Sequence, residues 1–190
     1  AQTFAKILIE QPPLIEHILA RMHTQYSLVN KAVNTGFVGV ALYLKSMGHR
    51  LSQEGLVNAI IALFLMDVGL SRIPSFVRGK EQNLSPEERR KVRTHTDLSV
   101  DMLMKMGCNE REILNGVLQH HERLDGSGYP KGLPREKIGF MGQLCAIADS
   151  FASMTMSRPH KQAMPLADAV GLLIKDNRYN QRIVALLRFL

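Results

Sequence analysis

The chain has 190 residues, of which 45% are hydrophobic and 22% are charged, and it contains no tryptophan. This length and balance fit one soluble globular domain with a buried core. The formal net charge is +7, but the basic residues are dispersed, and the densest run, "EERRKVRTH", alternates with acids and lacks aromatic residues. We therefore expect a solvated helix face and no nucleic-acid surface, although the charge fits a small polyanionic ligand.

The sequence shows no secretory or membrane signal. The opening "AQTFAKILIEQPP" lacks a charged n-region and a small-residue cleavage site, and we expect no apolar run of the roughly 18–20 residues needed to cross a bilayer. Cys108 and Cys145 lie in apolar surroundings, which predicts free thiols and no disulfide framework. We therefore expect a cytoplasmic protein. Because the sequence starts at Ala1, we also expect a segment of a longer protein.

Apolar residues recur at helical spacing along most of the chain. No alternating strand pattern persists for more than a few residues. The predicted fold class is therefore all-α, a compact bundle of about seven to nine helices. The expected helical segments, in chain order, are 12–22, 31–48, 52–69, 84–107, 109–121, 138–156, 165–177 and 180–190.

Capping residues mark several of these helices. Ser52 is the expected N-cap of a helix that is apolar on all sides and should therefore lie centrally in the core. Ser85 and Glu88 form an S-x-x-E capping box, with Pro86 at the first helical position. The segment 71–83, "SRIPSFVRGKEQN", is expected to be a loop because it combines proline, glycine and polar residues.

Five side chains in these segments have the chemistry of metal ligands. His120 and His121 differ by about 100° around a helix axis, so both face one point only near a helix end, which the following glycines supply. Asp67 and Asp149 interrupt apolar segments, where an unpaired carboxylate is costly. With His95 they form a nitrogen and oxygen set suited to iron, manganese, zinc or nickel. Each residue alone is more typical of a hydrogen-bonded core group than of a metal ligand, whereas the set together favours a metal site.

The stretch "HHERLDGSGYPKGLP", residues 120–134, resembles the signature of the HD-GYP family, a branch of the HD phosphohydrolase superfamily. The resemblance runs from about Lys31 to the C-terminus and includes "DVGLSRIP", "IADSFASM" and "SRPHKQAM". It implies an HD-domain-like fold over residues 31–190, with residues 1–30 as a helical lead-in. It also implies a centre of two or three metals that hydrolyses cyclic di-GMP, a bacterial second messenger.

The departures from the family pattern concern one of the metals. The family's His-Asp pair reads Met66-Asp67 here, and the lysine that normally follows shortly afterwards is replaced by Leu70. An earlier segment resembling "HSVNVA" reads "KAVNTG", which places Lys31 at or near a missing histidine ligand. The resemblance therefore implies that this metal retains only Asp67 and Asp149. The Lys31 ammonium is a candidate to replace the missing cation.

The second metal of the family pattern keeps its full set of ligands. The resemblance assigns to it the bridging Asp67 and the three later histidines, His95, His120 and His121. We therefore expect one divalent transition metal, iron or manganese, or none. His23 is a further candidate for a substitute ligand of the damaged site, although it lies too early in the sequence to align with the lost histidine.

The resemblance also implies ligand-binding residues outside the metal site. Arg158 and Lys161 match the family's phosphate-contacting pair, and the glycine-rich loop offers an aromatic face and close backbone approach. Without the family, the basic pair is ordinary surface charge and the loop a plain turn. The loop also resembles the surface through which relatives bind cyclases and other signalling proteins. Its candidate residues are Asp125, Gly128, Tyr129 and Pro130.

Three functions remain open from the sequence. The first is a degenerate signalling module that binds cyclic di-GMP, a related nucleotide or a partner protein with weak or no hydrolysis. The second is an active metal-dependent cyclic di-GMP phosphodiesterase, and the third is a metal-free scaffolding domain. Metal content separates the third from the others, and turnover separates the first two.

Overall fold

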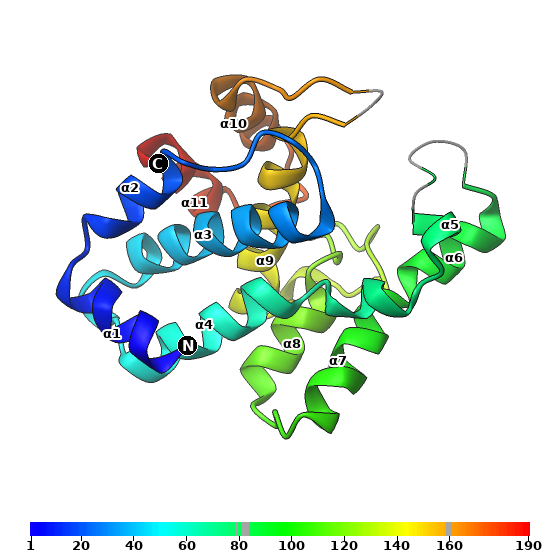
Figure 1. Cartoon of the computed structure of the whole chain (residues 1–190), viewed down its shortest axis with the longest axis horizontal. Helices are drawn as coiled ribbons and strands as arrows, with labels where there is room; N and C mark the ends of the chain where they lie inside the picture. Colours follow the sequence, from blue (N-terminus) through cyan, green and yellow to red (C-terminus); the bar gives the residue numbers. More distant parts are fainter. Residues whose placement is uncertain (79, 81–83, 159–160) are drawn as a thin grey trace.

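The computed structural model describes residues 1–78, 80, 84–158 and 161–190. Within these ranges the only β-pairing consists of two isolated bridges, which confirms the predicted all-α class (Figure 1). Eight described α-helices have eight residues or more, namely α1 (Gln2–Glu10), α3 (Leu28–Met47), α4 (Gln53–Leu65), α6 (Pro86–Arg93), α7 (His95–Lys105), α8 (Arg111–Gln119), α9 (Phe140–Met154) and α10 (Leu166–Lys175). Shorter α-helices and 3-10 helices join them: α2 (Leu14–Leu19), α5 (Ser75–Arg78), α11 (Gln181–Val184), η1 (Gly48–Arg50), η2 (Val68–Arg72), η3 (Arg135–Lys137) and η4 (Ala185–Phe189).

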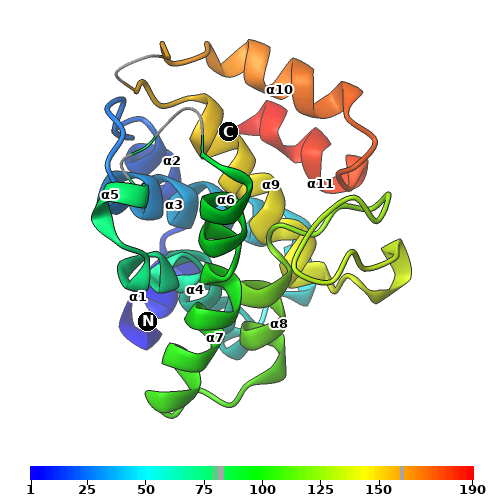
Figure 2. The same cartoon turned by 90° about the vertical axis from the view of Figure 1, so that its right-hand side faces the viewer.

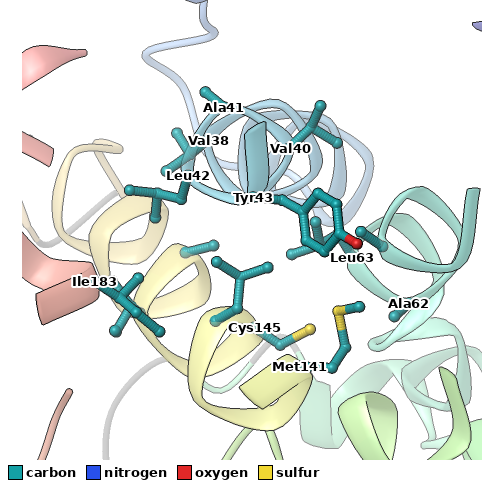
Figure 3. Packing of buried hydrophobic residues seen from close by; sticks show 14 of the residues in the cluster. Val38, Val40, Ala41, Leu42, Tyr43, Ala62, Leu63, Met141, Cys145 and Ile183 are labelled. Carbon is teal, nitrogen blue, oxygen red and sulfur yellow. The ribbon is translucent and has the colours of Figure 1, made fainter. Parts of the chain in front are cut away.

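The core lies where α3, α4, α8 and α9 pack against one another. Helix α3 packs against both α4 and α9, and α8 contacts these same two helices. Figure 3 shows the buried side chains of α3, α4 and α9 meeting, with Cys145 as a free buried thiol. A Cβ at Gly39 would lie 2.1 Å from the Leu63 side chain, so this glycine permits the close approach of α3 and α4.

The first thirty residues pack on the same core. Ala5 and Leu8 of α1 and Ile15 of α2 are buried in the main hydrophobic cluster, and the two helices contact α4 and α3 respectively. The chain then pairs with a distant segment, because Tyr26 N donates to Ser157 O at 2.9 Å. The division between a lead-in and a domain starting at residue 31 stays a prediction.

The predicted capping box is confirmed. The Ser85 side chain accepts from Glu88 N at 3.1 Å, and the Glu88 carboxylate accepts from Ser85 N at 2.9 Å. The expected single helix over 84–107 is instead two helices, because α6 ends at Arg93 and α7 begins at His95. Thr94 marks the break, where its hydroxyl donates to Lys91 O at 2.7 Å and competes with the regular helical bonding.

The segment 71–83 was expected to be a loop throughout, and this is wrong for part of it. Residues 71 and 72 complete η2, and Ser75–Arg78 form α5. Pro74 precedes α5, and its carbonyl accepts from Val77 N at 3.0 Å and Arg78 N at 3.1 Å, which closes this one-turn helix. The remainder of the predicted loop includes positions 79 and 81–83, which lie outside the described residues.

The apolar run through α4 is longer than the sequence analysis expected. The 20-residue helical stretch Gln53–Arg72 has a mean hydropathy of 1.6 and meets the length and composition of a membrane span. Core helices of soluble proteins meet the same test. In this chain α4 packs against α1, α3 and α8, and the stretch contains Asp67. These contacts are those of a core helix.

Close packing of η2 on α7 positions Asp67, the acidic residue between α4 and η2. Gly69 N donates to Ser99 Oγ at 2.8 Å. A Cβ at Gly69 would lie 2.3 Å from His95 O and 2.6 Å from Ser99 N. Both are backbone atoms that cannot turn aside, so this glycine allows Asp67 and His95 to approach each other.

We predict that Gly69→Ala destabilises the protein by about 1–3 kcal/mol, because the added methyl overpacks the contact between η2 and α7. The matched control is Gly171→Ala within α10, where an added Cβ meets no atom within 4 Å. This control should gain about 0.5–1 kcal/mol through better helix propensity. Chemical denaturation of both variants provides the measurement. Equal stability of the two variants would contradict the packing argument.

Candidate metal centre and ligand loop

Three side chains from different elements converge at the ends of their helices. Asp67 lies between α4 and η2, His95 begins α7, and His120 caps the end of α8. Asp67 Oδ1 lies 3.2 Å from His95 Nε2 and 3.5 Å from His120 Nε2, and these two nitrogens are 3.2 Å apart. The structure thus brings together residues separated by up to 53 positions in the chain, from 67 to 120.

Backbone carbonyls determine how the two imidazoles present themselves. His95 Nδ1 lies 2.7 Å from Val92 O, and His120 Nδ1 lies 2.6 Å from Val117 O. A carbonyl oxygen only accepts, so each Nδ1 carries a proton, and the neutral form of each ring turns an Nε2 lone pair toward the shared centre. Asp67 Oδ1 is buried and lacks a hydrogen-bond partner among the described residues. Three electron-pair donors facing one another require a cation, either a metal ion or a shared proton.

His121 completes the set. One ligand atom from each of Asp67, His95, His120 and His121 lies within 4.8 Å of all the others. Burial and the neighbouring His120 and His95 hold the pKa of His121 well below its usual value, which favours the neutral form that binds metals. One carboxylate oxygen and three imidazole nitrogens fit a divalent transition ion. These four residues are the predicted ligands of the family's second metal.

The Lys31 ammonium lies between the two predicted aspartate ligands. Its Nζ is 2.7 Å from Asp67 Oδ2 and 2.6 Å from Asp149 Oδ1. The first contact is also a hydrogen bond, and the second is an ion pair. Lys31, from α3, is only 7% exposed. The structure therefore places its positive charge where both carboxylates can share it.

The charges in this pocket stabilise one another. Burial alone would lower the pKa of Lys31, but the charges of Asp149 and Asp67 outweigh burial and raise it, so the side chain remains an ammonium. Burial likewise opposes ionisation of Asp67, yet the Lys31 charge holds the pKa of that carboxyl well below its usual range. An ammonium has no lone pair to offer a metal.

The other two altered positions do not supply a ligand. Met66 is 2% exposed and belongs to the hydrophobic core cluster. Leu70 is half-buried in η2. His23 is exposed, and its backbone is hydrogen-bonded to the Asn34 side chain. The metal-ligand cluster in the described part of the chain does not include His23.

The glycine-rich loop is anchored by a residue that the sequence analysis missed. Glu122 is 2% exposed, and its carboxylate accepts from Lys131 N at 2.7 Å and Leu133 N at 3.0 Å. A Cβ at Gly128 would lie 2.4 Å from Glu122 Cα, so only glycine allows the loop to fold back this closely. The position of Glu122 directly after the histidine pair is the sequence signal for this role.

The predicted loop residues face two environments. Asp125 is exposed and accepts from Ser127 N and Ser127 Oγ at 3.0 and 2.6 Å, which forms a local turn and lowers the Asp125 pKa. Gly128, Tyr129 and Pro130 are half-buried. Tyr129 stacks on His121 with ring centroids 4.6 Å apart and planes at 24°. Burial raises the pKa of its phenol, which keeps the hydroxyl protonated.

A second cation packs on Tyr129. The Arg93 guanidinium carbon lies 4.8 Å from the centroid of the Tyr129 ring. The sequence analysis predicted that this ring offers a face to a base, but His121 and Arg93 both lie against it. Base stacking on Tyr129 would therefore compete with one of these contacts.

Arg158 and Lys161 are brought together with each other and with the N-terminal segment. Their backbones form an isolated bridge, with N to O distances of 2.7 and 3.0 Å. The Arg158 guanidinium carbon lies 4.2 Å from the centroid of the Tyr26 ring. The Nε atom of Arg158 is buried and has no hydrogen-bond partner among the described residues. Tyr26 is a second residue that pattern reading missed, because it precedes the segment that resembles the family.

We predict that Lys31→Met destabilises the chelator-treated protein by about 3–5 kcal/mol, because two buried carboxylates lose their counter-charge. The control is Lys45→Met at an exposed position of the same helix, which should change stability by less than about 0.5 kcal/mol. Denaturant unfolding checks both values. A loss in Lys31→Met no larger than in the control would show that the ion pairs are not needed for stability.

Comparison with known proteins identifies the family to which the chain is similar over most of its length. A family model described as HD domain matches residues 3–183. The chain is 38% identical over 106 residues to a cyclic di-GMP phosphodiesterase of Thermotoga maritima, covering 55% of this chain and 29% of that protein. It is 26% identical over 174 residues to the cyclic di-GMP phosphodiesterase PA4108 of Pseudomonas aeruginosa, covering 91% and 41%. The chain thus spans less than half the length of either relative.

A solved structure supports the same assignment at the level of the fold. Bd1817, an HDG"Y"P protein from Bdellovibrio bacteriovorus, superimposes with a TM-score of 0.79 at 16% sequence identity. The superposition covers 99% of this chain and 60% of that protein. The extent of the family match, the sequence relatives and the shared fold agree. The chain therefore belongs to the HD domain family, and its predicted resemblance to the HD-GYP branch is confirmed.

Proposed function

We propose that this chain is a degenerate HD-GYP module that binds cyclic di-GMP or a related nucleotide and hydrolyses it slowly or not at all. The observation that carries the proposal is the position of the Lys31 ammonium, 2.7 Å from Asp67 and 2.6 Å from Asp149. By the family resemblance, these two carboxylates are the remaining ligands of the metal whose other ligands are missing from this sequence. A buried ammonium between them supplies the positive charge that a metal would otherwise provide.

The substitution changes what the pocket can do. An ammonium carries one positive charge and cannot coordinate water, whereas a second divalent ion clamps the attacking and leaving oxygens of a phosphodiester. Loss of that function raises the barrier by several kcal/mol and lowers the rate by several powers of ten. Binding depends less on this ion, because hydrogen bonds and charges from the protein persist without it.

The remaining donor set fits one metal ion. Asp67, His95, His120 and His121 would hold it, and the ion would supply a Lewis acid for a phosphoryl oxygen. The chain's own groups orient this site, because Val92 O and Val117 O hold the two imidazoles and Tyr129 packs on His121. The phenol hydroxyl of Tyr129 is a hydrogen-bond donor for a ligand oxygen.

An active metal-dependent phosphodiesterase is the second candidate. The four-residue donor set and the sequence similarity to cyclic di-GMP phosphodiesterases favour it.

The exposed tip of the loop, at Asp125 and Ser127, also supports docking of a signalling partner such as a cyclase domain. A metal-free scaffold would retain this docking surface alone.

We predict at most about one tightly bound iron or manganese ion per chain, as expected for a single site with four protein ligands. Metal analysis of freshly purified protein gives the count. His120→Ala should abolish tight binding, whereas His23→Ala, which removes an exposed histidine outside the cluster, should preserve it. Two tightly held ions per chain would show that the damaged site still binds metal.

We predict that the unmodified chain binds cyclic di-GMP and, under anaerobic conditions with iron or manganese, forms little linear dinucleotide or GMP. Calorimetry measures binding, and chromatography measures products on the same sample. The triple variant Lys31→His, Met66→His and Leu70→Lys, which restores the family pattern at all three positions, should gain turnover by at least tenfold. Rapid turnover by the unmodified chain would establish the active enzyme, and absence of both binding and turnover would favour the scaffold.

A further inference from the structure

Arg93 is coupled to the candidate metal centre through an aromatic ring. Its guanidinium carbon lies 4.8 Å from the Tyr129 centroid, and Tyr129 stacks at 4.6 Å on His121, one of the four candidate ligands. Arg93 itself is exposed. A solvent-accessible cation is therefore held beside the site.

The junction of α6 and α7 determines the position of this arginine. Helix α6 ends at Arg93 and α7 begins at His95, so only Thr94 separates the arginine from a candidate ligand. The far end of α6 is also held, because Glu88 completes the capping box with Ser85 and pairs with Lys80 at 2.6 Å. Figure 1 and Figure 2 show α6 continuing from the end of α7, and in Figure 1 it extends away from the helical body.

Positive charge collects along this helix. A cavity of about 280 Å³ is lined by three arginines and two apolar residues, namely Arg89, Arg90, Arg93, Leu84 and Pro86. Within residues 1–78, 80, 84–158 and 161–190, none of these guanidinium groups has a carboxylate within 4.0 Å. The Glu88 carboxylate is occupied by Lys80 and by Ser85 N. Among the described residues these arginines therefore have no ion-pair partner, and their positive charge favours anions.

The charge of the adjacent site favours cations outside the metal centre. Asp67 and Asp149, the Lys31 ammonium and one divalent ion together carry a single net positive charge. A cyclic dinucleotide has two phosphodiester anions, so one of them would be balanced by cations outside the metal centre, a role open to Arg93 as well as to the predicted pair Arg158 and Lys161. A guanidinium presents a planar fork of N–H donors that matches two phosphate oxygens.

We propose that Arg93 binds a phosphate group of the nucleotide ligand and that Arg89 and Arg90 strengthen the surrounding positive field. This inference rests on the proposed function, because it assigns part of the same ligand to α6. Arg93 lies on Tyr129 before the ligand arrives, and its exposed guanidinium reaches the phosphate by rotation of its own side chain. The contact adds affinity without contributing a ligand to the metal.

The first experiment tests whether ligand affinity depends on the charge and on the position of the Arg93 guanidinium. Titration calorimetry of the manganese-loaded chain with cyclic di-GMP should show a loss of affinity of about 10- to 100-fold in Arg93→Gln, the range for a lost hydrogen bond to a charged group. Arg93→Lys, which keeps the charge but not the fork, should lose less. Arg111→Gln removes an exposed arginine of α8 and should bind within about twofold of the unmodified chain.

Two further measurements separate phosphate binding from mere support of Tyr129. Melting temperature and metal content should be unchanged in Arg93→Gln, and a loss of either would overturn the binding role in favour of a structural one. Inorganic pyrophosphate, titrated into the chelator-treated chain and followed by NMR, should bind in an Arg93-dependent manner. This second probe does not require that the chain bind cyclic di-GMP.

The outcomes distinguish this inference from the proposed function. If cyclic di-GMP binds equally well to Arg93→Gln and to the unmodified chain, the inference is wrong and the proposed function stands. If the unmodified chain does not bind cyclic di-GMP but binds pyrophosphate through Arg93, the proposed function is wrong and the anion site is supported. If neither probe depends on Arg93, the anion site is excluded.

Discussion

A carboxylate surrounded by packed helices needs a positive partner, and the arrangement around Asp67 follows from that requirement. One of its oxygens meets the Lys31 ammonium, and the other faces two imidazole nitrogens that present lone pairs. Asp67 is therefore shared between two neighbouring pockets. In one of them the Lys31 ammonium balances its charge, and in the other, the candidate metal centre, a cation is needed between the lone pairs. The glycine at position 69 and the helix ends around it bring these partners within reach.

By the family resemblance, Lys31 stands at or near the position of a metal ligand, and such an exchange would alter chemistry more than stability. The ammonium balances two buried charges and holds α3, α4 and α9 together, which a metal would also do. It cannot polarise water or organise the oxygens of a phosphodiester. Under the proposed function, the pocket would keep the electrostatic balance of its family pattern and lose a catalytic element, and this separation would be the physical basis for a binding module with an enzyme fold.

The elements outside the metal site are coupled to it through aromatic contacts. Tyr129 joins the glycine-rich loop to His121, and Arg93 joins α6 to Tyr129. On another part of the chain, Tyr26 packs against Arg158 and connects the N-terminal segment to the predicted phosphate-contacting pair. Buried Glu122 anchors the loop between these groups. Tyr129 thus contacts a candidate ligand and α6 at once.

Local sequence determined the helical class, the capping box at Ser85 and the metal-ligand chemistry of the histidine pair, because these depend on residues a few positions apart. The family resemblance also pointed to Lys31, but only tertiary structure decided that its Nζ lies within bonding distance of an aspartate 36 residues away. The Arg93 contact with Tyr129 and the Tyr26 contact with Arg158 were beyond sequence reading for the same reason. The break at Thr94 was missed although it involves a local hydrogen bond to Lys91 O. Helical periodicity specifies which face of a helix is buried, whereas the partner of each side chain depends on how separate helices pack.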